Sequence, residues 1–317
     1  MSAWNQALDA AGIRDPGLRD DYTRQRELTA RFKRSAYLAA RLLLPRPLFP
    51  HVMAMTAFMH HSDNLLDSGA KEERAAAYDA WERQVRAALA TGGSGHPVLR
   101  PVLHTLGAHP RLRGHIEEYL VTARADLDFA GFATEADHQA YVDAYSLPAF
   151  LLVACLLAPD GDGTEFRAAC RTFIDAGQRL DFVNDLAEDL ADGRLTIPRE
   201  TLARHGVTRE DLEQARDLPG TRELITTVLG QARATLADSR PLVTIVPAPG
   251  RPLVRALISF DELTAAAAAR KGAGLLTAPA RPSAAGAVRV LLREYARARR
   301  LRRAGAGGTR PGLRPRP

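Results

Sequence analysis

The 317-residue chain contains little of what several classes of protein require. Its two cysteines, Cys155 and Cys170, cannot form a disulfide framework, and neither lies in the Cys/His spacing of a tetrahedral metal site. Aromatic residues make up only 6% of the chain, which favours helix over sheet. The first residues lack the basic and then apolar pattern of a signal peptide, and no uninterrupted apolar run reaches the roughly 18 residues of a membrane span, the longest being 148–159. We therefore expect a soluble, cytoplasmic protein.

Positive charge is concentrated at the C-terminal end of the chain. The net charge is +6, but the residues from Arg293 onward contain nine arginines and one glutamate. That end alone carries +8, so the rest of the chain carries −2 and is nearly neutral. No nucleic-acid-binding motif accompanies the basic end, and we expect no nucleic-acid partner.

Helical periodicity dominates the sequence, and no stretch alternates with period two for long enough to form a sheet. An apolar run at 146–158 contains Pro148. The chain therefore predicts an all-α fold, with a single domain over residues 1–303 and a basic, disordered tail over 304–317. The predicted helices cover 17–44, 49–66, 71–90, 97–108, 111–130, 164–190, 208–216, 221–237, 250–270 and 284–303.

The first acidic cluster reads Asp63-Asn-Leu-Leu-Asp67. On a helix, carboxylates four residues apart lie on one face, one turn apart. Their repulsion costs a few tenths of a kcal/mol, and this cost is offset when a cation binds between them.

The second acidic cluster lies in the predicted helix 164–190, where Asp181, Asp185 and Asp189 form a stripe with Glu188 beside it and Gln178 one turn earlier. Pairs of carboxylates suit Mg²⁺, which keeps several waters and takes further ligands from a substrate phosphate. Two such helices facing each other would hold Mg²⁺ ions against a diphosphate and neutralise it as it leaves.

Longer segments around the acids resemble the squalene/phytoene synthase family. Residues 185–198, DLAEDLADGRLTIP, look like its DxxED…GRxxxP signature, and Gln178 falls at a family Gln. Asp126 to Tyr141 is similar to the family's DL…T…Y segment, and the chain's opening is similar to that of actinobacterial phytoene synthases. The resemblance covers about residues 7–300. It implies an isoprenoid-synthase-type helical bundle around a central cavity, isoprenyl diphosphate substrates and Mg²⁺, with Asp63, Asp67, Asp185 and Asp189 as metal ligands supported by Glu188.

The chain also departs from the family pattern, mainly by losing Arg and Tyr positions around the acids. The departures are Phe49, Thr56, His60, His61, Asn64, Tyr145, Pro148, Asp181 and Asn184. Head-to-head condensation binds two prenyl diphosphates and needs more cationic and polar groups than a single ionisation does. Metal-assisted ionisation is therefore expected to remain, whereas the second prenyl site is in doubt.

This combination is similar to the phytoene-synthase-like aromatic prenyltransferases of actinobacteria. The expected reaction transfers a farnesyl-type chain from an isoprenyl diphosphate to a small-molecule acceptor, such as indole C3 of a tryptophan-containing cyclic dipeptide. Three alternatives stay open: a phytoene or squalene synthase, a terpene cyclase on the same fold, and a non-catalytic accessory subunit. The last requires lost metal binding, although all four principal acids are present.

Further roles can be assigned to individual side chains. His60, His61 and Asp181 are candidate proton acceptors, because each is expected near the metal helices and imidazole titrates near neutral pH. Candidate diphosphate-binding cations are Lys33, Arg34 and Arg194, and candidate pocket residues are Phe49, Tyr141, Tyr145 and Gln178. The predicted helix 284–303 places Val288, Leu291, Leu292 and Tyr295 on one face, which either packs on the domain or makes transient contact with a membrane surface.

Overall fold

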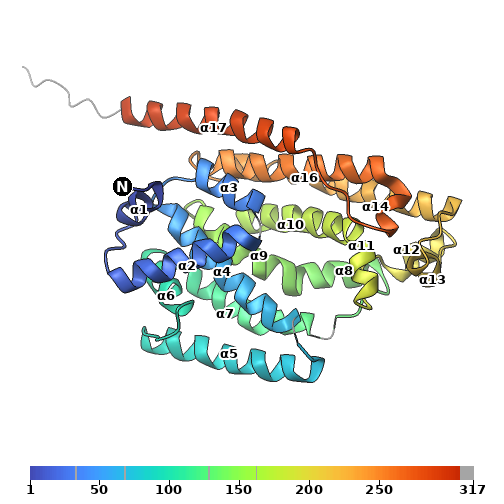
Figure 1. The fold of residues 1–317 in the computed structure, drawn as a ribbon, viewed down its shortest axis with the longest axis horizontal. Helices are drawn as coiled ribbons and strands as arrows, with labels where there is room; N and C mark the ends of the chain where they lie inside the picture. Colours follow the sequence, from blue (N-terminus) through green and yellow to red (C-terminus); the bar gives the residue numbers. More distant parts are fainter. Residues whose placement is uncertain (33, 68, 128, 162, 308–317) are drawn as a thin grey trace, which may run out of the picture.

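The computed structural model describes residues 1–307 except 33, 68, 128 and 162 (Figure 1). Helices make up almost all of the regular structure, and the one extended pairing within these ranges is an isolated bridge between Gly131 and Leu195. The predicted all-α fold is confirmed.

The helical elements follow one another in this order. The α-helices are α1 (Ala3–Ala10), α2 (Pro16–Phe32), α3 (Arg34–Leu43), α4 (Leu48–Asp67), α5 (Lys71–Thr91), α6 (Leu99–Ala108), α7 (Leu112–Thr122), α8 (Glu135–Tyr141), α9 (Leu147–Ala154), α10 (Thr164–Asn184), α11 (Leu186–Ala191), α12 (Arg199–Arg204), α13 (Arg209–Glu213), α14 (Pro219–Asp238), α15 (Leu242–Ile245), α16 (Arg251–Lys271) and α17 (Ala284–Gly307). The 3₁₀ turns are η1 (Ala123–Asp126), η3 (Cys155–Leu157) and η4 (Gly272–Leu276), and η2 (Val142–Ser146) is a π-helical turn.

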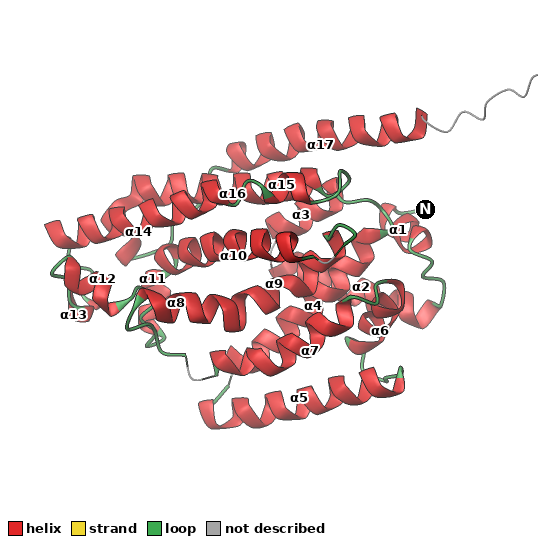
Figure 2. Cartoon of the chain, turned by 180° about the vertical axis from the view of Figure 1, so that it is seen from behind, coloured by secondary structure: helices red, strands yellow, loops and turns green. Residues whose placement is uncertain are grey.

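The helices form an elongated bundle with two outer helices on opposite sides (Figure 1). Helix α5 runs along one long edge and α17 along the other, while α4, α9 and α10 lie between them. The short helices α12 and α13 close one end, and α1 lies at the other. The reverse view in Figure 2 shows the same order.

Helix α4 runs through the centre of the bundle because it is apolar on nearly every side. Met53, Met55 and Phe58 are fully buried, and α4 packs against α2, α5, α6 and α9. A helix that is apolar all round is expected to be buried. The first acidic cluster lies at the C-terminal end of α4, where Asp63 and Asp67 are half-buried.

The structure differs from the predicted helices at several points. The stretch 17–44 forms two helices, α2 and α3, and 111–130 ends as an α-helix at Thr122, where η1 follows. The prediction of one helix over 164–190 is wrong, because α10 ends at Asn184 and a separate helix, α11, begins at Leu186. The helices α1, α8, α9, α12 and α15, all of them short, were not predicted. The start of α8 is marked in the sequence by a capping box formed by Thr134 and Asp137.

Elements α8, η2, α9 and η3 form one continuous helix from Glu135 to Leu157. By length and composition alone, this helix is apolar enough to cross a membrane, although polar residues interrupt its apolar sequence. Half of its most apolar window is buried, and α9 packs against α4, α7 and α10. The core helix of a soluble protein has the same properties.

The C-terminal helix continues beyond its predicted end at residue 303, through Gly307. The remainder of the predicted tail, 308–317, lies outside the described residues, as does Lys33.

Candidate active site

The first acidic wall consists of Asp63 and Asp67, one turn apart on the last part of α4. The hydroxyl of Tyr145 donates a hydrogen bond to Oδ1 of Asp63. Nη2 of Arg194, in the loop after α11, donates to Oδ1 of Asp67 at 2.7 Å. These two contacts join α4 to the helix 135–157 and to the second acidic motif, which lies 127 residues away in sequence.

A third carboxylate, Asp126, lies beside this wall and was not assigned a role from the sequence. It comes from η1, is buried, and accepts a hydrogen bond from the Tyr141 hydroxyl at 2.7 Å. Burial raises the pKa of Asp126 to about 6, with the nearby Asp67 and Asp63 adding to the rise and Tyr141 and Arg194 opposing it. Only its place in the DL…T…Y segment singled it out beforehand.

The second acidic wall is built around the break between α10 and α11. Asp185 occupies the junction, with φ −99° and ψ 14°, which are not helical values. The predicted stripe of Asp181, Asp185 and Asp189 on one straight helix is therefore wrong, because the helix breaks at its middle residue. The side-chain amide of Asn184 donates to Oδ1 of Asp185 at 2.9 Å, and its oxygen accepts from the amide of Ala280 at 2.9 Å. The break is therefore fixed by hydrogen bonds on both sides of Asn184.

Asp189 completes this wall one turn further along. It accepts a hydrogen bond from the Thr196 hydroxyl at 3.2 Å. Burial raises the pKa of Asp189 to about 6, and neighbouring Asp185 and Asp192 raise it further, while Thr196 and Arg194 lower it. Asp189 on the second wall and Asp126 beside the first are thus carboxylates whose ionised forms burial destabilises.

The turn that follows α11 brings Arg194 back toward α4. Gly193 has φ +79°, a left-handed conformation that favours glycine, and the amide of Arg194 bonds to the carbonyl of Asp189 at 2.8 Å. The next residue, Leu195, pairs with Gly131, where an added Cβ would lie 2.2 Å from the Leu195 carbonyl oxygen. Glycine at both positions allows this loop to pack closely enough for Arg194 to reach Asp67.

The two candidate histidines take different positions. His61 lies two residues before Asp63, so the two side chains are about 200° apart around the helix. The centroid of the His61 ring lies 4.5 Å from that of Trp81 and 5.5 Å from that of His96. The structure therefore does not bring His61 to the acids. His60 lies closer to their face and stacks on Phe32 with ring centroids 3.6 Å apart. Burial lowers the pKa of both imidazoles, so both are neutral at pH 7.

The other predicted site residues are divided between the site and the rest of the fold. Oε1 of Gln178 accepts from the Ser146 hydroxyl at 3.0 Å, which joins α10 to the π turn. Asp181, Glu188 and Arg34 are exposed. Phe49 begins α4, fourteen residues before Asp63 and so about 21 Å along the helix. It packs edge-on against Trp4 at 5.6 Å, and the structure does not bring it to the acids.

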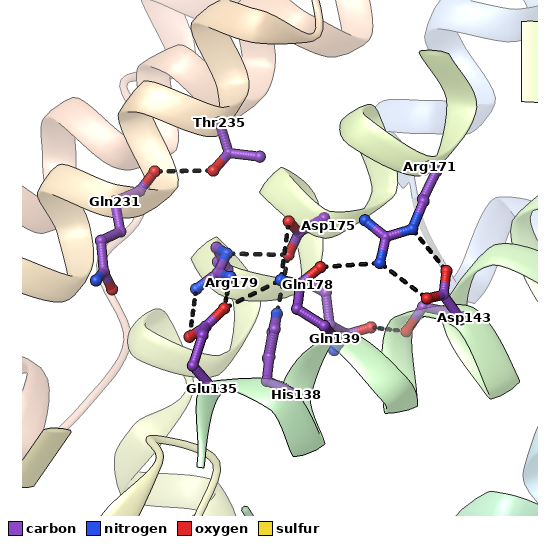
Figure 3. A network of polar contacts seen from close by, with 11 residues as sticks. Glu135, His138, Gln139, Asp143, Arg171, Asp175, Gln178, Arg179, Gln231 and Thr235 are labelled. Carbon is purple, nitrogen blue, oxygen red and sulfur yellow. Dashed lines mark hydrogen bonds and ion pairs between the residues drawn. The ribbon is translucent and has the colours of Figure 1, made fainter. Parts of the chain in front are cut away.

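A buried polar network clamps α8 against α10 next to the site (Figure 3). Nε2 of His138 lies 2.9 Å from Asp175, and Arg179 forms ion pairs with Asp175, at 2.9 Å, and with Glu135. One turn along, Arg171 binds Asp143 and Gln139. The network holds together the two helices that carry Tyr141, Tyr145 and Gln178.

The residues present fit a divalent cation. The donors are carboxylate oxygens, which Mg²⁺ prefers, and burial raises the pKa of Asp126, beside the first wall, and of Asp189, on the second. Within the described ranges, no three His, Cys, Asp or Glu side chains lie close enough to hold an ion by themselves. The arrangement therefore suits an ion that takes one or two carboxylates and completes its coordination with water and diphosphate oxygens.

Comparisons with known proteins agree with this arrangement. The family model of squalene/phytoene synthase matches residues 29–284. The chain is 28% identical over 264 residues to the bifunctional protein CrtB/UppS of Streptomyces coelicolor, covering 81% of this chain and 46% of that protein. It is 34% identical over 121 residues to the phytoene synthase of Thermus thermophilus, covering 38% of this chain and 39% of that protein. The chain thus spans less than half the length of both curated relatives.

Solved structures share the fold over most of its length. The squalene synthase HpnC of Alicyclobacillus acidocaldarius is 25% identical, with a TM-score of 0.66 over 94% of this chain and 98% of that one. A dehydrosqualene synthase in complex with a ligand is 20% identical, with a TM-score of 0.78 over 88% and 96%. The architecture is that of an all-α isoprenoid synthase. The chain belongs to the squalene/phytoene synthase family, whose members are prenyltransferases that use a divalent metal.

Proposed function

We propose that this protein is a Mg²⁺-dependent prenyltransferase that ionises an isoprenyl diphosphate, farnesyl diphosphate in particular, and transfers the prenyl group to an aromatic acceptor such as indole C3. The observation that carries the proposal is the Arg194–Asp67 contact, which brings the two acidic motifs to one place. Bound Mg²⁺ would neutralise the departing diphosphate. Asp63 and Asp67 on one side, and Asp185 and Asp189 with Glu188 on the other, would hold it.

The remaining steps depend on the side chains around the acids. The C–O bond to diphosphate breaks with its electron pair on oxygen and leaves an allylic cation, which an electron-rich ring attacks to form a C–C bond. Arg194 and Arg34 supply positive charge for the released diphosphate. Lys33 was assigned the same role but lies outside the described residues. A neutral His60, whose buried Nδ1 has no hydrogen-bond partner in the described part of the chain, or the exposed Asp181 would accept the proton from the ring.

A second candidate is head-to-head condensation of two prenyl diphosphates. The relatives named phytoene synthase, squalene synthase and dehydrosqualene synthase favour it. The loss of Arg and Tyr positions on the helix that carries the first acids, which leaves Thr56 and His60 in their place, favours transfer to an acceptor instead.

The two reactions can be separated with purified protein, Mg²⁺ and farnesyl diphosphate, with and without a tryptophan-containing cyclic dipeptide. A farnesylated dipeptide, detected by mass spectrometry, is the expected product. A C30 hydrocarbon, or a C40 product from geranylgeranyl diphosphate, would instead identify head-to-head condensation. Diphosphate release without either product would point to a cyclase or to a different acceptor.

We also propose that α17 makes peripheral contact with an anionic membrane surface, where prenyl substrates partition. Glu294 on its inner side is buried and pairs with Arg255, Arg293 and Arg297. The outer side carries an exposed apolar stripe, spaced four and three residues apart and flanked by arginines, that consists of Val288, Leu292 and Tyr295.

Sedimentation with vesicles tests this contact. Binding to phosphatidylglycerol vesicles, and not to phosphatidylcholine vesicles, is expected, with a loss in the double variant Val288→Ser, Leu292→Ser. Equal sedimentation of the variant and the wild type would contradict the contact.

A further inference from the structure

The helix 135–157 is distorted at one point, and the distortion lies beside the acids. In a regular α-helix, the amide of residue 148 would bond to the carbonyl of Ala144. Pro148 has no amide hydrogen, and its ring crowds that carbonyl. The amide of the preceding residue, Leu147, bonds to the carbonyl of Val142, five residues back, which is the hydrogen bond of a π turn. Pro148 thus explains why the helix widens at Val142–Ser146.

The π turn presents two tyrosines to two different carboxylates. Tyr141, immediately before the turn, donates to Asp126, and Tyr145, inside it, donates to Asp63. Their ring centroids are 5.4 Å apart, so the two phenol rings are direct neighbours. The Ser146–Gln178 hydrogen bond ties the end of the turn to α10, and the network in Figure 3 fixes α8 before it.

The geometry of Tyr145 makes its hydroxyl a hydrogen-bond donor to Asp63. The hydroxyl lies within hydrogen-bond distance of Oδ1 of Asp63, and a phenol, with an ordinary pKa of about 10, carries its proton at neutral pH. The phenol therefore directs its proton at the Asp63 carboxylate. A carboxylate held in this way has one orientation, and it loses less conformational freedom when it binds a cation.

We propose that Tyr145, presented by the π turn that Pro148 imposes, is a positioning residue that orients Asp63 for Mg²⁺ and diphosphate. The proposal rests on the proposed function, because it assigns Asp63 to the metal. Hydrogen-bond partners of metal ligands commonly contribute 10- to 100-fold to metal affinity.

Binding of Mn²⁺ in the presence of inorganic diphosphate tests the proposal without turnover. The signal of free Mn²⁺ in electron paramagnetic resonance gives the affinity for the full-length protein. Tyr145→Phe removes the hydroxyl and keeps the ring, and it should weaken Mn²⁺ binding about tenfold. Tyr78→Phe on α5, which also removes the hydroxyl of a buried tyrosine but one that donates to the Leu120 carbonyl, is the matched control and should bind as the wild type does. Thermal melting of each variant shows that it is folded.

Pro148→Ala provides a second, independent variant, because it keeps every atom of Tyr145 and allows a regular α-helix. It should weaken Mn²⁺ binding in the same direction as Tyr145→Phe. In steady-state assays, the Mg²⁺ concentration for half-maximal diphosphate release should rise about tenfold in both variants, whereas kcat at saturating Mg²⁺ changes much less.

The outcomes separate this proposal from the proposed function. Wild-type affinity, or tighter binding, in Tyr145→Phe would overturn the role of Tyr145. Wild-type affinity in Pro148→Ala alone would overturn the role of the π turn. If the wild-type protein itself bound no Mn²⁺ with diphosphate, the metal site and the proposed function would fail together.

Discussion

The two acidic walls hold their carboxylates in different ways. On the first wall, Asp63 and Asp67 lie on a regular, central helix, and their orientation comes from partners on other elements, Tyr145 and Arg194. On the second wall, Asp185 sits at a break between two helices, and its nearest partner is its own neighbour, Asn184. The first wall is oriented by tertiary contacts, and the second by local backbone geometry together with one tertiary contact, between Asn184 and Ala280.

The acids of the two walls also differ from the ionic network beside them, because we assign the acids to catalysis and the network to stability. Each wall holds two carboxylates four residues apart, and their repulsion lowers the stability of the protein until a cation binds between them. The network of Asp175, His138 and Arg179 nearby is closed on itself and stabilises the packing of α8 on α10. Substitutions should therefore change either activity or stability, according to the group that they remove.

The largest expected effect is on catalysis. Asp63→Asn or Asp185→Asn removes one acid from one wall, and each should slow diphosphate release at saturating Mg²⁺ by about 100-fold or more, because several kcal/mol of charge stabilisation is lost. Asp238→Asn, at the exposed end of α14, is the matched control. Rates within threefold of wild type for either wall variant would remove that wall from the site.

The next effect is on stability. Asp175→Asn takes the charge from a buried ion pair and leaves Arg179 with Glu135 as its partner, so the free energy of unfolding should fall by about 3 kcal/mol in urea titrations. Asp143→Asn disturbs the more exposed pair with Arg171 and should cost no more than about 1 kcal/mol. Equal losses in the two variants would show that the buried ion pair contributes no more to the free energy of unfolding than the exposed one.

Removing a charge from the acid site should stabilise the metal-free protein. The pKa of Asp126 is about 6 in the folded state and about 3.9 in an unfolded chain, so the folded state holds the proton more tightly. Ionised Asp126 therefore lowers stability as pH rises through 6. Asp126→Asn should gain on the order of 1–2 kcal/mol at pH 7.5 and nothing at pH 4. A gain that is the same at both pH values would not come from this titration.

The smallest effect on stability is expected for Arg194. Its ion pair with Asp67 is partly exposed, with 28% and 39% of the two side chains accessible, so Arg194→Gln should cost less than about 1 kcal/mol. The KM for the prenyl diphosphate should nevertheless rise about tenfold, because a cation for the diphosphate is lost, and Arg194→Lys should restore part of it. An unchanged KM would show that Arg194 does not bind the diphosphate and only pairs with Asp67.

Sequence periodicity located the long apolar helices closely. The predicted 49–66 and 250–270 correspond to α4 (Leu48–Asp67) and α16 (Arg251–Lys271). It could not locate the break at Asp185, because the apolar pattern continues across it and only the local φ and ψ reveal the junction. The short helix α8 was accessible through its capping box and not through periodicity.

The site shows the same division. The Asp pairs were identified by spacing, and the position of His61 away from Asp63 follows from a separation of two residues on a helix. Asp126 and the Tyr145–Asp63 contact could not be derived by spacing, since Tyr145 and Asp63 lie 82 residues apart and meet only through tertiary packing. Pro148 signalled a distortion in its helix, but not which side chain the distortion would redirect.

A crystal structure with Mg²⁺ and the slowly reacting analogue farnesyl thiodiphosphate tests the central claim most directly. Our account predicts metal ions that contact Asp63 or Asp67 on one wall and Asp185 or Asp189 on the other, with Arg194 on the diphosphate. A diphosphate bound elsewhere, with the Asp67–Arg194 ion pair intact and no metal on either wall, would contradict it.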